Sequence, residues 1–225
     1  MPQSELVTLL VAAYLVGGIP FGFIIARHRG VDLRKAGSGN VGATNVGRVL
    51  GKKWGVLVFI LDLGKGALVS IVAAKLASSH SESETMRDWV WLACGASCIV
   101  GSIFPIYLRF QGGKGVAASL GVILGIYPYL TLPGLLAFAL WVIVVKASGY
   151  VSLASLSAAV FLPLGYTVMA WFAPWPLSVH YPLLALQATL SVLVFIRHRE
   201  NIRRLLAGTE NRIGRTGDGQ TKPAS

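Results

Sequence analysis

Two long stretches of this chain contain no Lys, Arg, Asp or Glu, and they restrict the fold more than any other feature. One covers the 31 residues 115–145 and the other covers the 50 residues 147–196. About 20 apolar residues are enough for a helix to cross a bilayer, and inside lipid every backbone polar group must be bonded within the protein. An all-α membrane protein is therefore expected. Composition agrees, since 13% of the residues are charged, against about 25% in soluble domains.

The spans can be counted by taking charged and polar segments as their ends. Residues 6–26, 54–74 and 89–108 predict three helices, and the proline-interrupted run 147–196 predicts two. No basic region precedes residues 6–26, so we expect a spanning helix there and not a cleaved signal. The run 115–145 is either one helix of about 46 Å or two short helices that break near residues 127–132.

The distribution of Lys and Arg decides between six spans and seven. The loop 27–53 carries seven of them against one Asp, and the tail from Arg197 carries seven more. Seven spans bring both to the same side, as the positive-inside rule requires. We therefore predict seven transmembrane helices with the N-terminus outside, the C-terminus in the cytoplasm and Gly-rich loops on the cytoplasmic side. One domain covers 1–212, and a polar, disordered tail covers 213–225. The net charge of +11 then fits anionic lipid and substrates and not nucleic acid.

The most distinctive polar segment is 37–48, Gly-Ser-Gly-Asn-Val-Gly-Ala-Thr-Asn-Val-Gly-Arg. Glycines let backbone N–H groups converge on an anion, and a guanidinium suits phosphate. A plain flexible turn would not need this run of polar side chains. The fit to G-x-G-x-x-G, with Asp62 twenty residues after Gly42, does not indicate a dinucleotide site because no βαβ unit is expected here. The predicted phosphate site comprises Gly37, Ser38, Gly39, Asn40, Gly42, Thr44, Asn45 and Arg48.

A second Gly-rich turn, residues 111–115, precedes an apolar run and is expected to open a helix. The free N–H groups and the positive dipole end at a helix start favour an anion. It is not a Walker A loop, because Gly115 stands where Ser or Thr would bind Mg²⁺. The predicted substrate contacts are Gly112, Gly113, Lys114 and Gly115. The alternative is a tight turn whose lysine only reaches toward the membrane surface.

Two pairs of polar residues lie at the ends of predicted spans. His198 and Asn201 are spaced i, i+3, so they share a helix face where the last span leaves the bilayer. Ser152 and Ser155 lie at the start of another span, where hydroxyls also occur simply as helix contacts. With the two Gly-rich turns, these pairs predict one polar site at one end of a helical bundle. It could hold a soluble phosphate beside a lipid chain.

Two further pairs lie inside predicted spans. Asp62 and Lys65 are three residues apart, and charges inside a membrane usually face the protein interior. They are either an internal ion pair or substrate contacts. Cys94 and Cys98 are spaced i, i+4 in an apolar segment, and we expect buried packing residues and not a disulfide or metal pair.

Nearly the whole chain resembles the PlsY family of bacterial membrane acyltransferases. Three motifs carry the resemblance: Gly37-Ser38-Gly39-Asn40-x-Gly42-Ala43-Thr44-Asn45, then Phe104-Pro105-x₄-Phe110-x-Gly112-Gly113-Lys114-Gly115, then His198-x₂-Asn201-Ile202-x-Arg204-Leu205-x₂-Gly208-Thr209-Glu210. The family's Asp-x₂-Lys-Gly also matches at Asp62, Lys65 and Gly66. One departure is Ser102, which stands where the family usually has His before Phe-Pro.

The resemblance implies acyl transfer from acyl phosphate to the 1-hydroxyl of sn-glycerol 3-phosphate, with lysophosphatidate and phosphate as products. Ser38 and Arg48 would bind and activate, the second motif would hold glycerol 3-phosphate, His198 and Asn201 would complete the site, and Glu210 would be structural. The family also implies a bacterial inner membrane and a cytoplasmic active site. Either His198 or the leaving phosphate could accept the hydroxyl proton.

No cofactor is expected. The sequence has no Cys, His and Asp cluster with metal-ligand spacing, so we also expect a metal-independent reaction. A transporter or channel for an organic phosphate is the competing function, because it would use the same basic loops and intramembrane charges. Against it, we find no inverted repeat, and the polar groups gather at one face instead of the midplane.

Overall fold

The computed structural model describes residues 2–80, 84–172 and 181–213, and those ranges fold into helices joined by short loops. In chain order the elements are α1 (Gln3–Gly18), α2 (Phe21–His28), α3 (Ala43–Leu50), α4 (Lys52–His80), α5 (Glu84–Ile103), the 3₁₀ helix η1 (Ile106–Leu108), α6 (Val116–Gly125), α7 (Thr131–Ser148), α8 (Val151–Phe172), α9 (Tyr181–Arg197) and α10 (Arg199–Leu206).

The length and apolar character of the helices fit an integral membrane protein. Within the described residues, five helical segments are long and apolar enough to cross a bilayer, namely Gln3–His28, Lys52–Ser79, Met86–Leu108, Thr131–Ser148 and Val151–Phe172. The pair α9 and α10, bent by 59° at their junction, would make a sixth. At 10 residues α6 is a shorter apolar helix. The prediction of a multi-helix membrane protein is confirmed.

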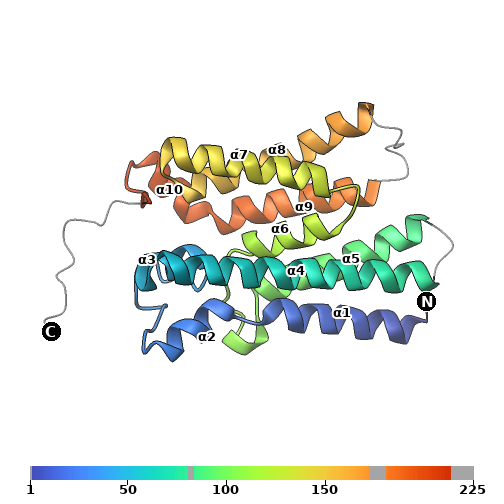
Figure 1. Ribbon diagram of the computed structural model, residues 1–225, viewed down its shortest axis with the longest axis horizontal. Coiled ribbons are helices and arrows are strands. Elements are labelled where there is room, and N and C mark those ends of the chain that lie inside the picture. Colours follow the sequence, from blue (N-terminus) through green and yellow to red (C-terminus); the bar gives the residue numbers. More distant parts are fainter. Residues whose placement is uncertain (1, 81–83, 173–180, 214–225) are drawn as a thin grey trace, which may run out of the picture.

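The helices run side by side in two layers (Figure 1). One layer holds α1, α4 and α5, the other holds α7, α8 and α9, and α6 lies between them. Glycines allow the closest approaches, as is common between helices in membranes. A Cβ on Gly66 of α4 would clash with the Ala118 carbonyl, and one on Gly121 of α6 would clash with the Leu63 carbonyl. These contacts fix α6 against α4.

The predicted break in the run 115–145 is present, since α6 ends at Gly125 and α7 begins at Thr131. The single helix expected over 6–26 is instead divided into α1 and α2. The reason is Pro20, which has no N–H to donate back into α1. This proline lies at the N-cap of α2, and the Ile24 N–H bonds to its carbonyl at 3.0 Å.

Other boundaries also differ from the sequence prediction. The loop 27–53 contains the short helix α3, which the density of Gly and charged residues concealed. The second span extends beyond 54–74 as α4. Within the third span, α5 ends at Ile103 because Pro105 stops it, and η1 continues the span to Leu108, where the sequence predicted its end. Pro174 and Pro176, expected to interrupt the last apolar run, and the tail beyond residue 213 lie outside the described residues.

The two cysteines are buried and free, as predicted: Cys94 is 1% exposed and Cys98 is 0% exposed. They belong to the main apolar core between the layers.

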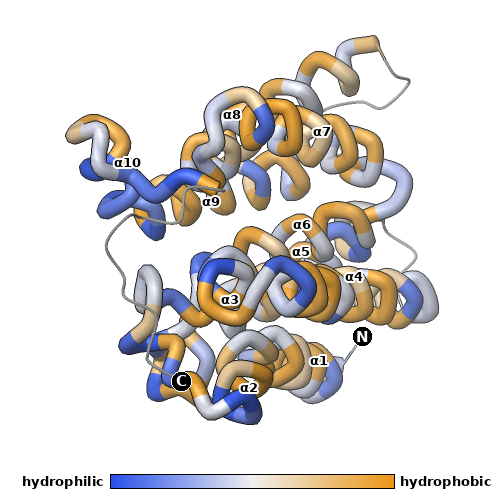
Figure 2. Tube along the Cα trace, turned by 60° about the vertical axis from the view of Figure 1, so that its left-hand side comes forward, coloured by the Kyte–Doolittle hydropathy of each residue, from blue (hydrophilic) through white to orange (hydrophobic). Residues whose placement is uncertain are grey.

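A second small core, made of Ala26, Leu33, Val46 and Val58, packs α2 and α3 onto the start of α4. Polar residues gather around α10 and the loops at the same end of the bundle (Figure 2). The polar loops therefore rest on an apolar base.

Candidate active site

A cavity of about 470 Å³ opens between the helix layers, and residues from all three sequence motifs line it. Every predicted site residue lies in a described part of the chain, and all of them line this cavity except Gly37 and Gly39. The lining includes Ser38, Asn40, Gly42, Thr44, Asn45, Arg48, Asp62, Lys65, Gly112, Gly113, Lys114, Gly115, Ser152, Ser155, His198, Asn201 and Glu210. Segments from five separate parts of the chain thus meet at one site.

The first Gly-rich loop is organised around Asn45, which is 1% exposed. Its amide nitrogen Nδ2 lies 3.0 Å from the Ala36 carbonyl and 2.8 Å from the Asn40 carbonyl, and its Oδ1 accepts the Ser38 N–H at 2.8 Å. Arg48 Nη1 lies 3.5 Å from the same Oδ1. Asn45 was predicted to bind substrate, but these contacts use its amide to hold the loop. Ser38 on that loop and Arg48 on α3 remain exposed.

The glycines of this loop have different functions. Gly37 and Gly39 have φ values of 60° and 71°, which other residues rarely adopt, so they shape the loop behind the cavity wall. Gly42 caps α3, and its N–H bonds to Asn40 Oδ1 at 2.8 Å. A Cβ built on Gly113 would lie 4.0 Å from Gly42 Cα. The two Gly-rich loops therefore meet at Gly42 and Gly113.

The second Gly-rich loop ends at Gly115, which caps α6 with φ 73°. Arg197, at the end of α9, donates from Nη2 to the Gly113 carbonyl at 3.0 Å. Its guanidinium also lies 5.4 Å from the ring centroid of Phe104. Arg197 lines the cavity and was not among the residues predicted from the sequence. Its place, directly after the 50-residue apolar run, was the signal that could have identified it.

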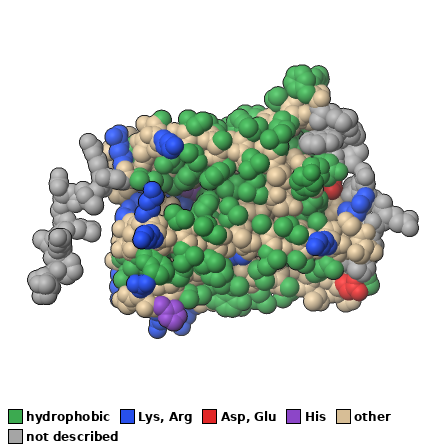
Figure 3. Space-filling model, in the orientation of Figure 1, with side chains coloured by type: hydrophobic (Ala, Val, Ile, Leu, Met, Phe, Trp, Pro, Cys, Tyr) green, Lys and Arg blue, Asp and Glu red, His purple; other side chains and the backbone are tan. Residues whose placement is uncertain are grey.

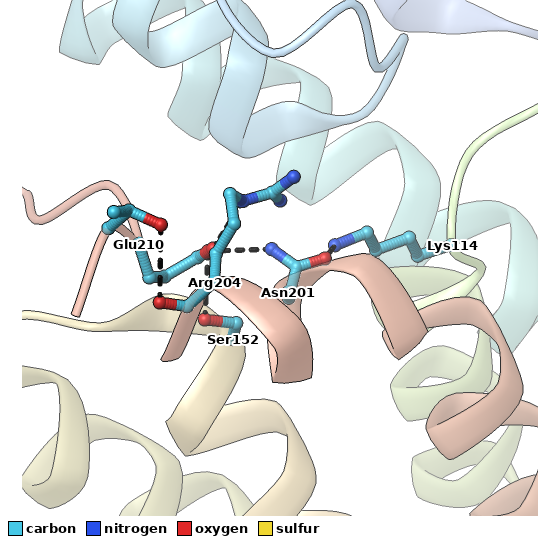
Figure 4. A network of polar contacts seen from close by, with 6 residues as sticks. Lys114, Ser152, Asn201, Arg204 and Glu210 are labelled. Atoms are coloured by element: carbon cyan, nitrogen blue, oxygen red, sulfur yellow. Dashed lines mark hydrogen bonds and ion pairs between the residues drawn. The ribbon is translucent and has the colours of Figure 1, made fainter. Parts of the chain in front are cut away.

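The third motif forms a network of hydrogen bonds around Glu210 (Figure 4). Its carboxylate accepts bonds from Asn201 Nδ2 at 2.6 Å, Ser152 Oγ at 3.0 Å and Arg204 Nε at 2.7 Å. Asn201 Oδ1 in turn accepts from Lys114 Nζ. The network joins α8, α10 and the second Gly-rich loop. Glu210 thus forms part of the cavity wall in addition to the structural function expected from the resemblance.

His198 lies at the bend between α9 and α10, and it is 2% exposed. Its Nδ1 lies 2.8 Å from the Val194 carbonyl. A carbonyl can only accept, so we assign the ring proton to Nδ1, which leaves Nε2 as an acceptor. Burial, with a smaller effect of the neighbouring Lys114 charge, lowers the pKa of His198 to about 4. The imidazole is therefore neutral near pH 7.

The electrostatics of the remaining site follow from burial and paired charges. Burial lowers the pKa of Lys114 to about 8, and the nearby Glu210 carboxylate partly opposes this. Burial raises the pKa of Glu210, but the bonds from Arg204, Asn201 and Ser152 outweigh it and lower that pKa overall. At neutral pH the site therefore combines cationic Lys114 with ionised Glu210. Most visible Lys and Arg side chains lie at this end of the bundle (Figure 3).

The two serines predicted as substrate contacts are buried and bonded to the protein. Ser152 donates to Glu210. Ser155 Oγ donates to the Val151 carbonyl at 2.9 Å and accepts from Trp141 Nε1 at 3.2 Å. Trp141, which also lines the cavity, was not predicted. Both hydroxyls orient other residues of the wall in this structure.

Asp62 and Lys65 form an ion pair of 2.7 Å within α4. Lys65 also donates to the Ile19 carbonyl at 2.9 Å. These contacts favour the internal ion pair among the two alternatives from the sequence.

Ser102, which departs from the family motif, lines the cavity too. Among the described residues, no three His, Cys, Asp or Glu side chains are grouped so that they could hold a metal ion.

Known proteins of one family are similar to this chain. A family model described as glycerol-3-phosphate acyltransferase matches residues 7–208. The chain belongs to the glycerol-3-phosphate acyltransferase family. It is therefore an acyltransferase, and the comparisons give no support to the transporter alternative.

Relatives in this family are similar along nearly their whole length. The glycerol-3-phosphate acyltransferase of Aquifex aeolicus is 42% identical over 205 residues, which are 91% of this chain and 97% of the relative. That of Geobacter sulfurreducens is 43% identical over 210 residues, or 93% of this chain and 98% of the relative. The resemblance to PlsY inferred from the motifs is thus confirmed.

Two solved acyltransferase structures share the fold. Both are crystal structures of PlsY (YgiH), an integral membrane glycerol 3-phosphate acyltransferase. Its glycerol 3-phosphate form is 41% identical with a TM-score of 0.80, and its lysophosphatidic acid form is 40% identical with a TM-score of 0.77. Each match covers 93% of this chain and 96% of the other. The membrane fold of this acyltransferase is therefore that of PlsY.

Proposed function

We propose that this protein transfers an acyl chain from acyl phosphate to the 1-hydroxyl of sn-glycerol 3-phosphate and releases lysophosphatidate and phosphate. The observation that carries this proposal is one cavity lined by two Gly-rich loops and by Arg48, Lys114 and Arg197. Two cationic loops suit two phosphate groups. The crystal structures of the similar PlsY hold glycerol 3-phosphate in one form and lysophosphatidic acid in another, which supports acceptor and product of this kind here.

The cavity offers a place for each part of the two substrates. Its polar end, at Arg48 and Lys114, suits the phosphates. Its deeper wall is apolar and includes Ile123, Leu162 and Leu190 from three different helices, which suits an acyl chain in the bilayer. The carbonyl to be attacked would then lie at the boundary between the polar and the apolar wall.

The chemistry needs no covalent enzyme intermediate, because acyl phosphate is an activated mixed anhydride. The oxygen of the glycerol 1-hydroxyl attacks the carbonyl carbon, the bond from that carbon to the phosphate oxygen breaks, and phosphate leaves. Holding both reactants in line can supply about 7–11 kcal/mol. Lys114, Arg48 and backbone N–H groups would stabilise the charge on the carbonyl oxygen and on the leaving phosphate.

The proton of the hydroxyl goes to the leaving phosphate in this proposal. His198 is a weak base, since its pKa is lowered to about 4, whereas a phosphate dianion takes up a proton near pH 6. A better-matched base transfers protons more efficiently near neutral pH. His198 would then use Nε2 to accept a hydrogen bond and position glycerol 3-phosphate, beside Asn201.

The proposal includes the membrane topology. Seven spans arise if α1 and α2 cross together and the short α6 counts as one. Polar loops and basic residues at one end of the bundle then face the cytoplasm of a bacterial inner membrane, in agreement with the positive-inside rule. The soluble acceptor would reach the site from the cytoplasm, and the acyl donor would reach it from the bilayer.

A direct assay tests the function. Purified protein in detergent receives acyl phosphate and glycerol 3-phosphate, and phosphate release is measured with each substrate alone and with both. Release above background only with both, and without loss in EDTA, is expected for metal-independent acyl transfer. Full turnover with acyl-CoA in place of acyl phosphate, or loss of activity in EDTA, would contradict the proposed donor or the metal independence.

A further inference from the structure

The ammonium group of Lys65 connects the middle of α4 to the break between α1 and α2. Its Nζ lies 2.7 Å from Asp62 Oδ1, 2.9 Å from the Ile19 carbonyl and 5.6 Å from the ring centroid of Phe21. Only 5% of the Lys65 side chain is exposed. All of its contacts are therefore inside the protein, at the wall of the cavity.

The Ile19 carbonyl needs such a donor because the chain is interrupted there. The last carbonyls of a helix have no partner within that helix. α1 ends at Gly18, and Pro20 contributes no N–H. A local bond from the Phe21 N–H reaches the same carbonyl at 3.2 Å. Lys65 adds a charged donor from another helix, which fixes the break relative to α4.

The position of α2 determines the position of the first Gly-rich loop. Gly22 of α2 packs so closely that a Cβ there would clash with the Val41 carbonyl and lie 3.2 Å from Val46 Cγ2. Val46 and Ala26 share a buried core. Val41 and Val46 belong to the segment that carries Ser38 and Arg48. A shift of α2 would therefore move those two residues relative to the second Gly-rich loop.

We propose that Lys65 is a positioning residue for acyl transfer: through its bond to the Ile19 carbonyl it holds α2, and with it the loop 37–48, in the geometry that the reaction needs. Asp62 has a different function. It balances the buried ammonium charge without touching the break, because an unpaired charge in the interior is strongly destabilising. This inference rests on the proposed function.

Two sets of variants separate positioning from stability. Asp62→Leu/Lys65→Met removes both charges, a change that is often neutral for stability, and also removes the donor to Ile19. We expect an unchanged Tm and a loss of kcat/KM for glycerol 3-phosphate of about 10- to 100-fold, since a displacement of about 1 Å can have such an effect. Asp62→Asn keeps the donor but unbalances the charge, so Tm falls while kcat/KM stays close to wild type. Lys65→Arg keeps both the donor and the positive charge, so its Tm and its kcat/KM should stay close to wild type.

A distance measurement reports the position of α2 directly. Nitroxide labels on cysteines replacing Arg27, at the end of α2, and Lys53, at the start of α4, both exposed, give a distance by pulsed electron paramagnetic resonance. We expect this distance to shift or broaden in Asp62→Leu/Lys65→Met and to be unchanged in Asp62→Asn. The native Cys94 and Cys98 are buried and should not be labelled.

The outcomes are distinct. A double variant with wild-type kcat/KM overturns the proposal, and so does lost activity with an unchanged distance, because Lys65 then acts without moving α2. If the double variant does not fold, Lys65→Gln replaces it, since its amide ends one bond short of the ammonium; a folded Lys65→Gln with wild-type kcat/KM overturns the proposal equally. Absence of turnover in the wild-type protein would instead overturn the proposed function.

Discussion

The carboxylate of Glu210 accepts a hydrogen bond from Asn201 Nδ2 at 2.6 Å and thereby turns the amide oxygen of Asn201 toward Lys114. The amide can satisfy both neighbours in only one orientation, because a carboxylate accepts and an ammonium donates. A residue outside the Gly-rich loops thus sets the direction of the polar groups that face the cavity. Glu210 is 6% exposed at its side chain, so water competes weakly for these bonds.

Replacing Glu210 by Gln should reduce both activity and stability. The charged acceptor for Arg204 is lost, and hydrogen bonds to charged groups contribute about 1.5–3 kcal/mol each. The Asn201 amide can then turn away from Lys114, and we expect kcat/KM to fall about tenfold, equivalent to about 1.4 kcal/mol. Tm and kcat/KM of Glu210→Gln measure the two effects. The matched control is Thr209→Ala, an exposed neighbour that should resemble wild type; an equal loss in the control would contradict the assignment.

His198→Gln tests whether the imidazole is a base or a positioning group. Glutamine keeps a hydrogen-bonding side chain but has no basic nitrogen. The lowered pKa of about 4 keeps His198 neutral across pH 5–9. We therefore expect the pH profiles of the wild type and of His198→Gln to have the same shape near pH 6.5, with no inflection lost in the variant. The effect should be mainly on KM for glycerol 3-phosphate. A fall in kcat of about 10³-fold or more at unchanged KM, within the range for a lost general base, would show that His198 is the base.

The motifs indicated residues that gather around one cavity, but they gave no information on which groups the side chains contact. Glycines, an arginine and a lysine in short loops indicate anion binding, because an anion needs backbone N–H groups and cations around it wherever in the fold such loops lie. Asn45 and Ser155 were expected to contact substrate, yet their polar atoms bond to the protein. A side chain's partner depends on which distant segment lies opposite, and a motif carries no information about that.

Two features of the fold were not predicted, for different reasons. The division of the first span follows from Pro20, which could have been given more weight. Helix α3 could not be separated from the basic loop by hydropathy, because its stability comes from Val46 packing in a small core with Val58 of α4. Glu210 entered the prediction only through the family resemblance. Its three partners lie 6, 9 and 58 residues away.

Two glycines of α4 give a matched test of helix packing. A Cβ on Gly66 would clash with the Ala118 carbonyl of α6, whereas a Cβ on Gly64 would meet nothing within 4 Å. Gly66→Ala should therefore lower Tm by forcing α4 and α6 apart. Gly64→Ala should be neutral or stabilise by up to about 1 kcal/mol, the gain expected for Ala over Gly in a helix. Thermal unfolding in detergent checks this, and equal Tm values for both variants would contradict the packing.

The proposed topology can be tested by labelling cysteines in intact cells. The loop between α4 and α5 is expected outside the cell, and the residues that follow α10 are expected in the cytoplasm. We choose Met86, near the start of α5, and Ile213, after α10, because both side chains are exposed. With α6 and α7 as separate spans, five spans lie between these positions and place them on opposite sides; with residues 115–145 as one span, both would lie on the same side. A membrane-impermeant thiol reagent should therefore label Met86→Cys from outside and Ile213→Cys only after lysis. The wild-type protein, with two buried cysteines, is the control. Labelling of both variants from the same side would contradict the seven-span arrangement.

The lowered pKa of Lys114 predicts the alkaline limit of activity. Burial brings this pKa to about 8 from its ordinary value of 10.5, so the ammonium is charged below about pH 8 and becomes neutral above it. Glycerol 3-phosphate is a dianion throughout this range, since its second pKa is near 6. Its attraction to the site should therefore weaken as the pH rises. We expect kcat/KM for glycerol 3-phosphate, which reports the free enzyme, to fall through about pH 8.

Lys114→Arg provides the control for this assignment. A guanidinium keeps its charge far above pH 8, so any activity that the variant retains should lose the alkaline fall. Initial rates of phosphate release from pH 6 to 9.5, corrected for hydrolysis of acyl phosphate without enzyme, give both profiles. If the fall in kcat/KM near pH 8 persists unchanged in Lys114→Arg, another group causes it. Deprotonation of Lys114 then does not set the alkaline limit for binding the acceptor phosphate.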